Sequence, residues 1–183
     1  MKKTVFILLG LIFMLSLSGC FNKKEKAAEL ADYLNDYMEV EEAYSISTLS
    51  MIGFRLDKDD KIDEDQLKDK LTEDILPGLE KRLEYLENVD LEYKSIQELN
   101  ESMIQHVKNG VDVYENLNET LQKGTEDEIG EAKDELKSFI SDSDREGEDI
   151  FNETEDLIEK YDVLVVTDYD EDGEEYERFD KGK

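Results

Sequence analysis

Apolar residues recur at alternating steps of three and four along most of this chain, and that spacing constrains the fold more than any other feature. It places apolar side chains on one face of an α-helix, and that face has to be buried against another element. The chain has one Pro and no Trp in 183 residues, which favours long helices over a loop-rich β domain. We therefore predict an all-α fold.

The repeat divides the chain into four amphipathic segments, at about residues 25–55, 63–86, 95–121 and 125–161. Short polar connections between such segments favour an antiparallel up-and-down bundle. We predict a bundle of about four helices over residues 27–161. In chain order, its seam residues are Leu30, Tyr33, Tyr37, Val40, Tyr44, Ser47, Met51, Phe54; Leu67, Leu71, Ile75, Leu79, Leu83, Leu86; Ile96, Leu99, Met103, His106, Gly110, Val113, Leu117, Leu121; and Ile129, Ala132, Leu136, Phe139 or Ile140, Ser143, Gly147, Ile150, Thr154, Leu157, Tyr161.

Capping residues mark several expected helix ends. In a capping box, two side chains three residues apart each accept a backbone N–H of the first helical turn. The third segment begins at Asp90 or Ser95 and ends where Gly124 can act as its C-terminal cap. The expected capping boxes are Asp63 with Gln66, Ser95 with Glu98, and Thr125 with Glu128.

Two stretches weaken this helical pattern. Pro77-Gly78 lies inside the second segment, so we expect a kink or break near Leu76. The fourth segment is weak in its middle, at residues 141–144 and 146–149, because Ser, Asp and Gly are poor helix formers.

The C-terminal residues 162–183 have a different character. Residues 163–167 form a β-branched run, residues 175–179 alternate, and Asp172-Gly173 lies between them. This arrangement predicts a short acidic β-hairpin or tail after the bundle.

The first twenty residues have the features of an export signal. Lys2 and Lys3 are followed by an apolar run over residues 4–17, which is too short for a comfortable membrane span. The run ends in Leu17-Ser18-Gly19-Cys20. This sequence resembles the lipobox of bacterial lipoproteins, in which small residues precede a cysteine that receives diacylglycerol on its sulfur and becomes the new N-terminus. The alternative is a plain membrane anchor with an inert cysteine, which the length and the Ser-Gly-Cys ending disfavour.

The resemblance implies that residues 1–19 are a signal peptide and that Cys20 is the lipid attachment site. Residues 20–26 would then be a lipidated tether at the outer face of the bacterial cell membrane, its lysines either near anionic headgroups or simply solvated. Several acyl chains hold a protein stably on a bilayer. Because Cys20 is the only cysteine, no disulfide forms within the chain.

A second resemblance concerns residues 72–121. This stretch contains Ile-Leu-Pro, then Leu-Glu-Tyr-Leu, then a long helical segment. In that order of motifs it is similar to uncharacterised helical-bundle lipoproteins of Gram-positive bacteria. This resemblance implies a helical bundle and carries no activity with it.

The charge of the chain excludes some partners. The net charge is −28, and without Lys2 and Lys3 the remainder has 50 acids against 20 bases, or −30. Phosphate contacts need clustered Lys and Arg, so we expect no nucleic acid. Such a surface attracts cationic peptides or metal ions, although the acidity is equally explained by a salty or alkaline exterior.

A calcium site is the most specific alternative. Asp168, Asp170, Asp172 and Gly173 match the first half of an EF-hand loop, with oxygen ligands at alternate positions and Gly at the turn. The twelfth position, which should be a bidentate Glu, is Phe179. An acidic hairpin turn therefore explains the pattern better than a calcium site, and we assign no metal ligand.

Catalytic residues are not evident in the sequence. His106 is the only histidine; on a helix seam we expect it to be a packed core residue, and it has no companion ligands for zinc. We expect no catalytic residue and no cofactor. Tyr33, Tyr37 and Tyr44 share one helix face, where core packing is favoured over a groove for an apolar partner.

These observations predict a lipid-anchored, non-enzymatic module of the cell envelope that binds a protein or cationic peptide partner. The alternative is a surface protein that binds a small ligand or calcium, and an envelope hydrolase ranks third because no constellation of nucleophile and base is recognisable.

Overall fold

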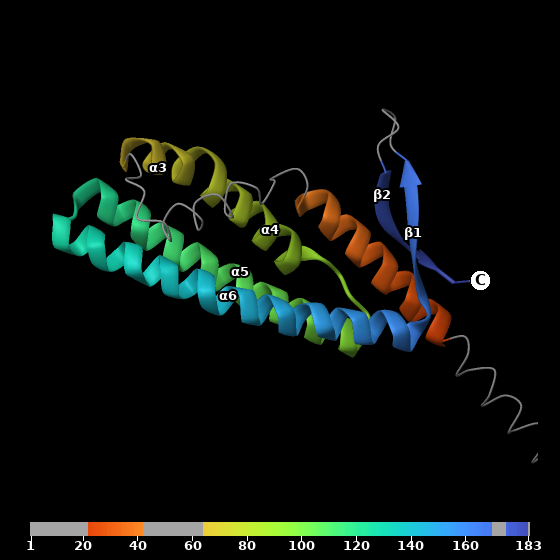
Figure 1. The fold of residues 1–183 in the computed structure, drawn as a ribbon. Coiled ribbons are helices and arrows are strands. Elements are labelled where there is room, and N and C mark those ends of the chain that lie inside the picture. Colours follow the sequence, from red (N-terminus) through yellow and green to blue (C-terminus); the bar gives the residue numbers. More distant parts are fainter. Residues whose placement is uncertain (1–21, 42–63, 170–174, 183) are drawn as a thin grey trace, which may run out of the picture. The chain divides into compact units, whose positions relative to one another are not determined.

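The computed structural model describes residues 22–41, 64–169 and 175–182 (Figure 1). It confirms the predicted fold class, a helical bundle followed by a two-stranded antiparallel hairpin. The described elements are a helix over residues 22–41, α3 (Glu64–Lys70), the π-helical segment η1 (Leu71–Ile75), α4 (Leu76–Asn88), α5 (Lys94–Lys123), α6 (Glu126–Tyr161), β1 (Val163–Tyr169) and β2 (Glu175–Lys181).

The chain forms two compact units. The larger is Asp36–Thr154, and the smaller combines Met1–Asn35 with Glu155–Lys183. Helix α6 contributes residues to both, since its last turns belong to the smaller unit. The hairpin therefore belongs to the same unit as the first turns of the helix over residues 22–41.

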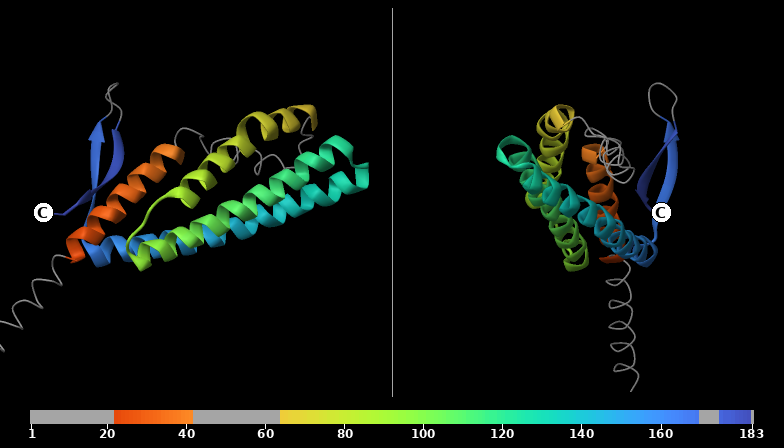
Figure 2. Two further views of the ribbon diagram at one scale, coloured as in Figure 1. Left: turned by 180° about the vertical axis from the view of Figure 1, so that it is seen from behind. Right: turned by 60° about the vertical axis from the view of Figure 1, so that its left-hand side comes forward.

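The core of the larger unit lies along α5, which packs against α4, η1 and α3. Figures 1 and 2 show α4 and α5 side by side. The buried apolar side chains that α3, η1, α4 and α5 supply are Leu67, Leu71, Ile75, Leu79, Leu86, Ile96, Leu99, Met103, Val107, Tyr114 and Leu117.

Helices α5 and α6 form an antiparallel pair, as the predicted bundle requires. Their contacts run in opposite directions along the two helices: Ser102 of α5 meets Glu153 of α6, and Asn116 of α5 meets Glu135. Between them, the rings of Tyr114 and Phe139 meet edge to face, with centroids 6.2 Å apart. Figure 2 shows the two helices side by side in both views.

The second helix does not break at Pro77. Instead it widens into the π-helical segment η1 immediately before, where the N–H of Leu76 bonds to the carbonyl of Leu71 five residues earlier. Proline has no N–H to donate, and its ring clashes with the carbonyl four residues back. A π-helical turn relaxes that clash, so the helix continues into α4 with Pro77 in its first turn.

One predicted helix cap was wrong. Helix α5 starts at Lys94, capped by the extended backbone of Tyr93 without a side-chain bond, so Ser95 lies inside the helix rather than at its cap. Helix α6 is continuous through residues 141–149, the stretch whose helical pattern is weak, because the cost of each weak helix former is modest.

The predicted caps between α5 and α6 are confirmed. Oγ1 of Thr125 accepts the N–H of Glu128 at 3.4 Å, and Oε2 of Glu128 accepts the N–H of Thr125 at 2.7 Å. The N–H of Thr125, and then its hydroxyl, which donates to Oε2 at 2.9 Å, lower the pKa of the Glu128 carboxyl. Gly124 is the C-terminal cap of α5, and a Cβ there would lie 2.7 Å from the carbonyl oxygen of Thr120. The Asp63 and Gln66 box involves a residue outside the described ranges.

In the smaller unit, the hairpin pairs all seven residues of β1 with β2, from Val163 opposite Lys181 to Tyr169 opposite Glu175. Asp162 turns the chain from α6 into β1 with a positive φ of 60°, a conformation that Asp tolerates. Its carboxylate pairs with Lys23, and Lys26 lies over the ring of Tyr161. Residues 22–26, within the stretch predicted as a tether, are helical.

Candidate functional site

A cleft of about 590 Å³ lies between α5 and α6. We call it the acidic cleft. Five of its lining residues are carboxylates, and none of the residues that line it is Lys or Arg. Its lining residues are Glu98, Glu101, Ser102, Gln105, His106, Asn109, Glu146, Asp149, Ile150 and Glu153.

The cleft exists because α6 buries little in this region. Between Leu136 and Leu157, no α6 side chain is buried. The two helices are joined there by polar contacts such as the bond from the Ser102 hydroxyl to Glu153. Where polar side chains rather than packed apolar ones join α5 to α6, the space between the two helices has room for water and solutes.

His106 is central to these contacts. Its Nδ1 lies 3.3 Å from Oε2 of Glu146, and its Nε2 lies 3.4 Å from Oγ of Ser143. In the neutral ring, Nδ1–H donates to the carboxylate and Nε2 accepts the serine proton. No sequence pattern links these three residues, because only the antiparallel pairing of α5 and α6 brings residues 106 and 143 together.

The expectation that His106 packs in the core was wrong. Its side chain is 29% exposed, whereas Val107, one residue later, is buried. Similarly, Tyr114 is buried in place of the predicted Val113. A helix turns about 100° per residue, so a buried stripe drifts from a strict seven-residue seam. That drift presents His106 to the cleft.

The order Ser143–His106–Glu146 is that of a nucleophile, base and acid. A serine hydrolase also needs donors for the oxyanion, commonly backbone N–H groups that include the one following the nucleophile. Ser143 lies in the interior of α6, where backbone N–H groups are bonded along the helix. The three side chains link α5 to α6, and the helical backbone around Ser143 offers no free N–H for an oxyanion.

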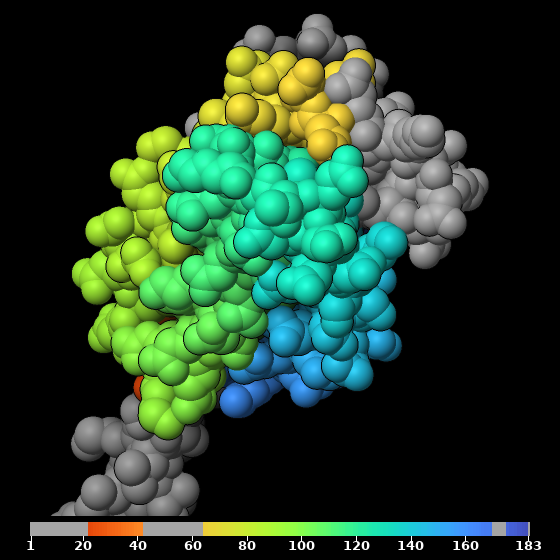
Figure 3. All heavy atoms as spheres, turned by 90° about the vertical axis from the view of Figure 1, so that its left-hand side faces the viewer, coloured from red at the N-terminus to blue at the C-terminus, as the bar shows by residue number. Residues whose placement is uncertain are grey.

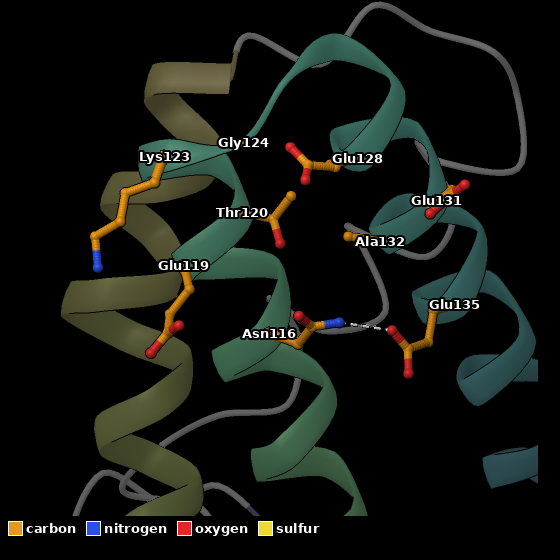
Figure 4. Close-up of a pocket in the computed structure, with 9 residues that line it drawn as sticks. All are labelled: Asn116, Glu119, Thr120, Lys123, Gly124, Glu128, Glu131, Ala132 and Glu135. Carbon is orange, nitrogen blue, oxygen red and sulfur yellow. Dashed lines mark hydrogen bonds between the residues drawn. The ribbon is translucent and has the colours of Figure 1, made fainter.

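A second hollow, of about 440 Å³, lies where α5 turns into α6 (Figure 4). Glu128, Glu131 and Glu135 line its α6 side, and Asn116 points to Glu135, to which it donates a bond of 2.7 Å. Lys123 is also part of its lining. Figure 3 shows this end of the larger unit with α3 next to the turn. The hollow is acidic too, but it is partly neutralised by its lysine.

Arg82 is a buried charge that was not predicted. Its side chain is 7% exposed and lies 3.7 Å from Glu41, while its Nε has no hydrogen-bond partner among the described residues. Tyr37 lies beside this pair; burial, and then Glu41, raise its pKa to about 12. Arg82 directly precedes Leu83, which the seam placed in the core but which is only partly buried. The leucine pattern of α4 therefore gave no signal that Arg82 is buried.

The residues of the alternative calcium site are only partly described. Asp168 lies in β1, where its Oδ2 accepts Nε–H of Arg178 at 2.9 Å. The N–H of Tyr169 and then Arg178 lower the pKa of the Asp168 carboxyl. Asp170 and Asp172 lie outside the described residues. Within the described ranges, no cluster of three or more His, Cys, Asp or Glu side chains is arranged to hold a metal ion.

Of the other residues that were predicted from the sequence, some lie within the described ranges and some outside them. Tyr33 is buried and Tyr37 partly buried, so these two tyrosines pack as expected. Tyr44 and the lipid attachment residue Cys20 lie outside the described ranges. No described helix is both long enough and apolar enough to cross a bilayer.

The sequence matches no protein-family model, no curated protein and no solved structure. The site therefore has to be interpreted from its own geometry and charge.

Proposed function

We propose that the protein is a bacterial lipoprotein, anchored through Cys20 at the outer face of the cell membrane, that binds a cationic protein or peptide in the acidic cleft. The observation that carries the binding role is the cleft itself, with five carboxylates and no Lys or Arg among its lining residues. The anchoring role rests on the lipobox-like sequence at residues 17–20.

Electrostatics supports a cationic partner. A cleft lined by one sign of charge concentrates the field and raises the local concentration of counter-ions. The net charge of −28 adds long-range attraction, which speeds encounter more than it tightens the complex. Three of the five carboxylates have partners: Glu98 pairs with Lys94, Glu146 with His106, and Glu153 accepts the Ser102 hydroxyl. Glu101 and Asp149 are therefore the most available carboxylates of the lining.

Calorimetry with a ten-residue oligolysine peptide tests the binding role. Replacing two exposed carboxylates, in Glu101→Gln with Asp149→Asn, should weaken binding about fivefold, at roughly 0.5 kcal/mol for each ion pair. The matched control is Asp112→Asn with Glu115→Gln, which removes the same charge from exposed positions of α5 outside the cleft. Equal effects of the two double variants would show that net charge alone attracts the peptide.

Mass spectrometry of the protein isolated from cells tests the anchoring role. The expected product begins at Cys20 and carries acyl chains on that residue. An unmodified thiol at position 20 would refute the anchor without affecting the peptide measurement, so the two halves of the proposal fail independently.

A further inference from the structure

The two outer edges of the C-terminal hairpin differ. A two-stranded sheet has an unpaired edge on each strand, and proteins usually protect such edges with Lys, Pro, a bulge or a covering element. The edge of β2 is covered by Asn35. The edge of β1 has none of these protections among the described residues, because β1 contains no Lys or Pro and pairs with β2 without a bulge.

Asn35 binds β2 as another strand would. Its Nδ2 donates to the carbonyl of Phe179 at 2.9 Å, and its Oδ1 accepts the N–H of Phe179 at 2.8 Å. Both backbone groups of Phe179 therefore point away from β1. In an antiparallel ladder, residues that face outward alternate with residues that bond to the neighbouring strand.

This alternation determines which groups of β1 are free. Val165 lies opposite Phe179 and Thr167 lies opposite Glu177, so the N–H and C=O groups of Val165 and Thr167 also point outward. In the described part of the chain, no hydrogen bond is made to these four groups. They form a ready template for one more strand.

The side chains beside this template are exposed. Leu164 and Val165 point to opposite faces of the hairpin, and each is 50% exposed. Both faces of β1 are therefore open at this point. Single exposed apolar residues are ordinary, but adjacent ones along a bare edge mark an interaction surface.

We propose that the free edge of β1 binds an extended, basic segment of another protein by strand addition. This surface is distinct from the acidic cleft, so the inference goes beyond the proposed function. Backbone bonds at Val165 and Thr167 supply the attachment, and alternate side chains of the guest supply the selectivity.

Charge selects a basic guest over a second copy of this chain. The two strands carry four acids and two bases, and a second copy would bring another strongly acidic body. Glu175 and Glu177 lie on the same face as Val165 and Thr167, whereas Leu164 and Val166 lie on the other. A guest strand that places Lys on the face of Glu175 and Glu177, and Val on the face of Leu164 and Val166, matches the charge of one face and the apolar character of the other.

The test measures binding of a seven-residue peptide of alternating Lys and Val to the full-length protein, by fluorescence anisotropy. The control peptide has the same side chains but is N-methylated at alternate residues, so that it cannot bond to β1. We expect the control to bind at least tenfold more weakly. Equal binding of the two peptides would overturn the proposal, as would equal binding of an alternating Glu and Val peptide.

Val165→Pro tests the edge in the protein itself. Proline removes an outward N–H that β2 does not use, so the hairpin is retained and peptide binding should fall at least tenfold. Val165→Thr keeps the N–H and should stay within about threefold of the original protein. Undiminished binding by the proline variant would refute strand addition.

Two further measurements determine whether the acidic cleft or a second copy of the chain accounts for the binding. The tenfold difference between the plain and the N-methylated peptide should persist in the cleft variant Glu101→Gln with Asp149→Asn, because the cleft is a different surface. Loss of that difference in the cleft variant would place the peptide in the cleft and overturn the proposal. Without peptide, sedimentation should show that the protein does not self-associate through the β1 edge. Self-association through that edge would be recognised because Val165→Pro abolishes it. Such an association would identify a second copy as the occupant and overturn the proposal as well.

Discussion

Helices α4 and α6 both pack against α5, but they do so differently. Helix α4 buries four of its thirteen residues, including Leu79 and Leu86. Helix α6 has 36 residues, and within the larger unit it buries only Ala132 and Leu136. Dense burial excludes water along α4, whereas the sparse contact with α6 leaves the acidic cleft. One face of α5 is therefore buried against α4, and another lines the acidic cleft.

The largest expected effect tests the burial on the α4 side. Leu86→Ala should lower the free energy of unfolding by about 3 kcal/mol, because it removes a fully buried side chain and leaves a cavity. Ile150→Ala, on the cleft side of α6, should cost less than about 1 kcal/mol, since that residue is only partly buried. Urea unfolding of both variants measures the difference, and similar losses would contradict the contrast.

The apolar end of the α5–α6 contact should weaken in alkali. Burial raises the pKa of Tyr114 to about 12 from its ordinary value of 10.0. As the pH rises, the Tyr114 hydroxyl therefore loses its proton in the unfolded protein before it does so in the folded protein. The contribution of Tyr114 to the free energy of unfolding is intact below pH 10 and disappears as the pH rises to 12. The loss is about 2–3 kcal/mol at most. Urea unfolding at about pH 8 and about pH 11 should show a smaller alkaline loss in Tyr114→Phe than in the original protein.

Two asparagines on α5 allow the α4 side and the α6 side of this helix to be compared with the same type of side chain. Asn100 is buried and donates to the carbonyl of Leu86 in α4, whereas Asn116 is exposed and donates to Glu135 in α6. Asn100→Ala should cost about 2 kcal/mol because it leaves a buried carbonyl unpaired. Asn116→Ala should cost less than about 0.5 kcal/mol. Thermal unfolding distinguishes these values, and a larger effect at Asn116 would reverse our interpretation.

The smallest effect concerns local stabilisation of α6. Thr125→Ala removes the side chain that caps the first turn and should cost about 1 kcal/mol. Hydrogen exchange should increase first at the N-terminal amides of α6. Ser141→Ala, at an exposed interior position, should be neutral or slightly stabilising because Ala is the better helix former. If Thr125→Ala left exchange unchanged, packing rather than capping would hold this end of α6.

Local patterns predicted much of the fold. The repeat of apolar residues identified the helices, Thr125 with Glu128 identified the start of α6, and the β-branched run identified β1. These features depend on neighbours within four residues. The same kind of pattern was misleading at Ser95, where the backbone of Tyr93 capped the helix without a side chain.

The candidate site was not predictable in the same way. His106 was assigned to the core because a seven-residue seam was assumed, and the actual drift of the helix buried Val107 instead. Its neighbours Ser143 and Glu146 come from a helix whose middle was expected to be weak. Asn35 and Phe179 are separated by 144 residues, and no local pattern links them.

The sequence by itself determined that this chain is helical, strongly acidic and begins with a lipobox-like motif, because periodicity, charge and a short motif can be recognised without knowing what lies opposite. Tertiary structure alone decided which face of α5 is dry, where the acidic cleft forms and which edge of the hairpin is covered. Those properties depend on contacts between residues far apart in the chain, and such contacts follow from helix pairing and strand register rather than from local composition.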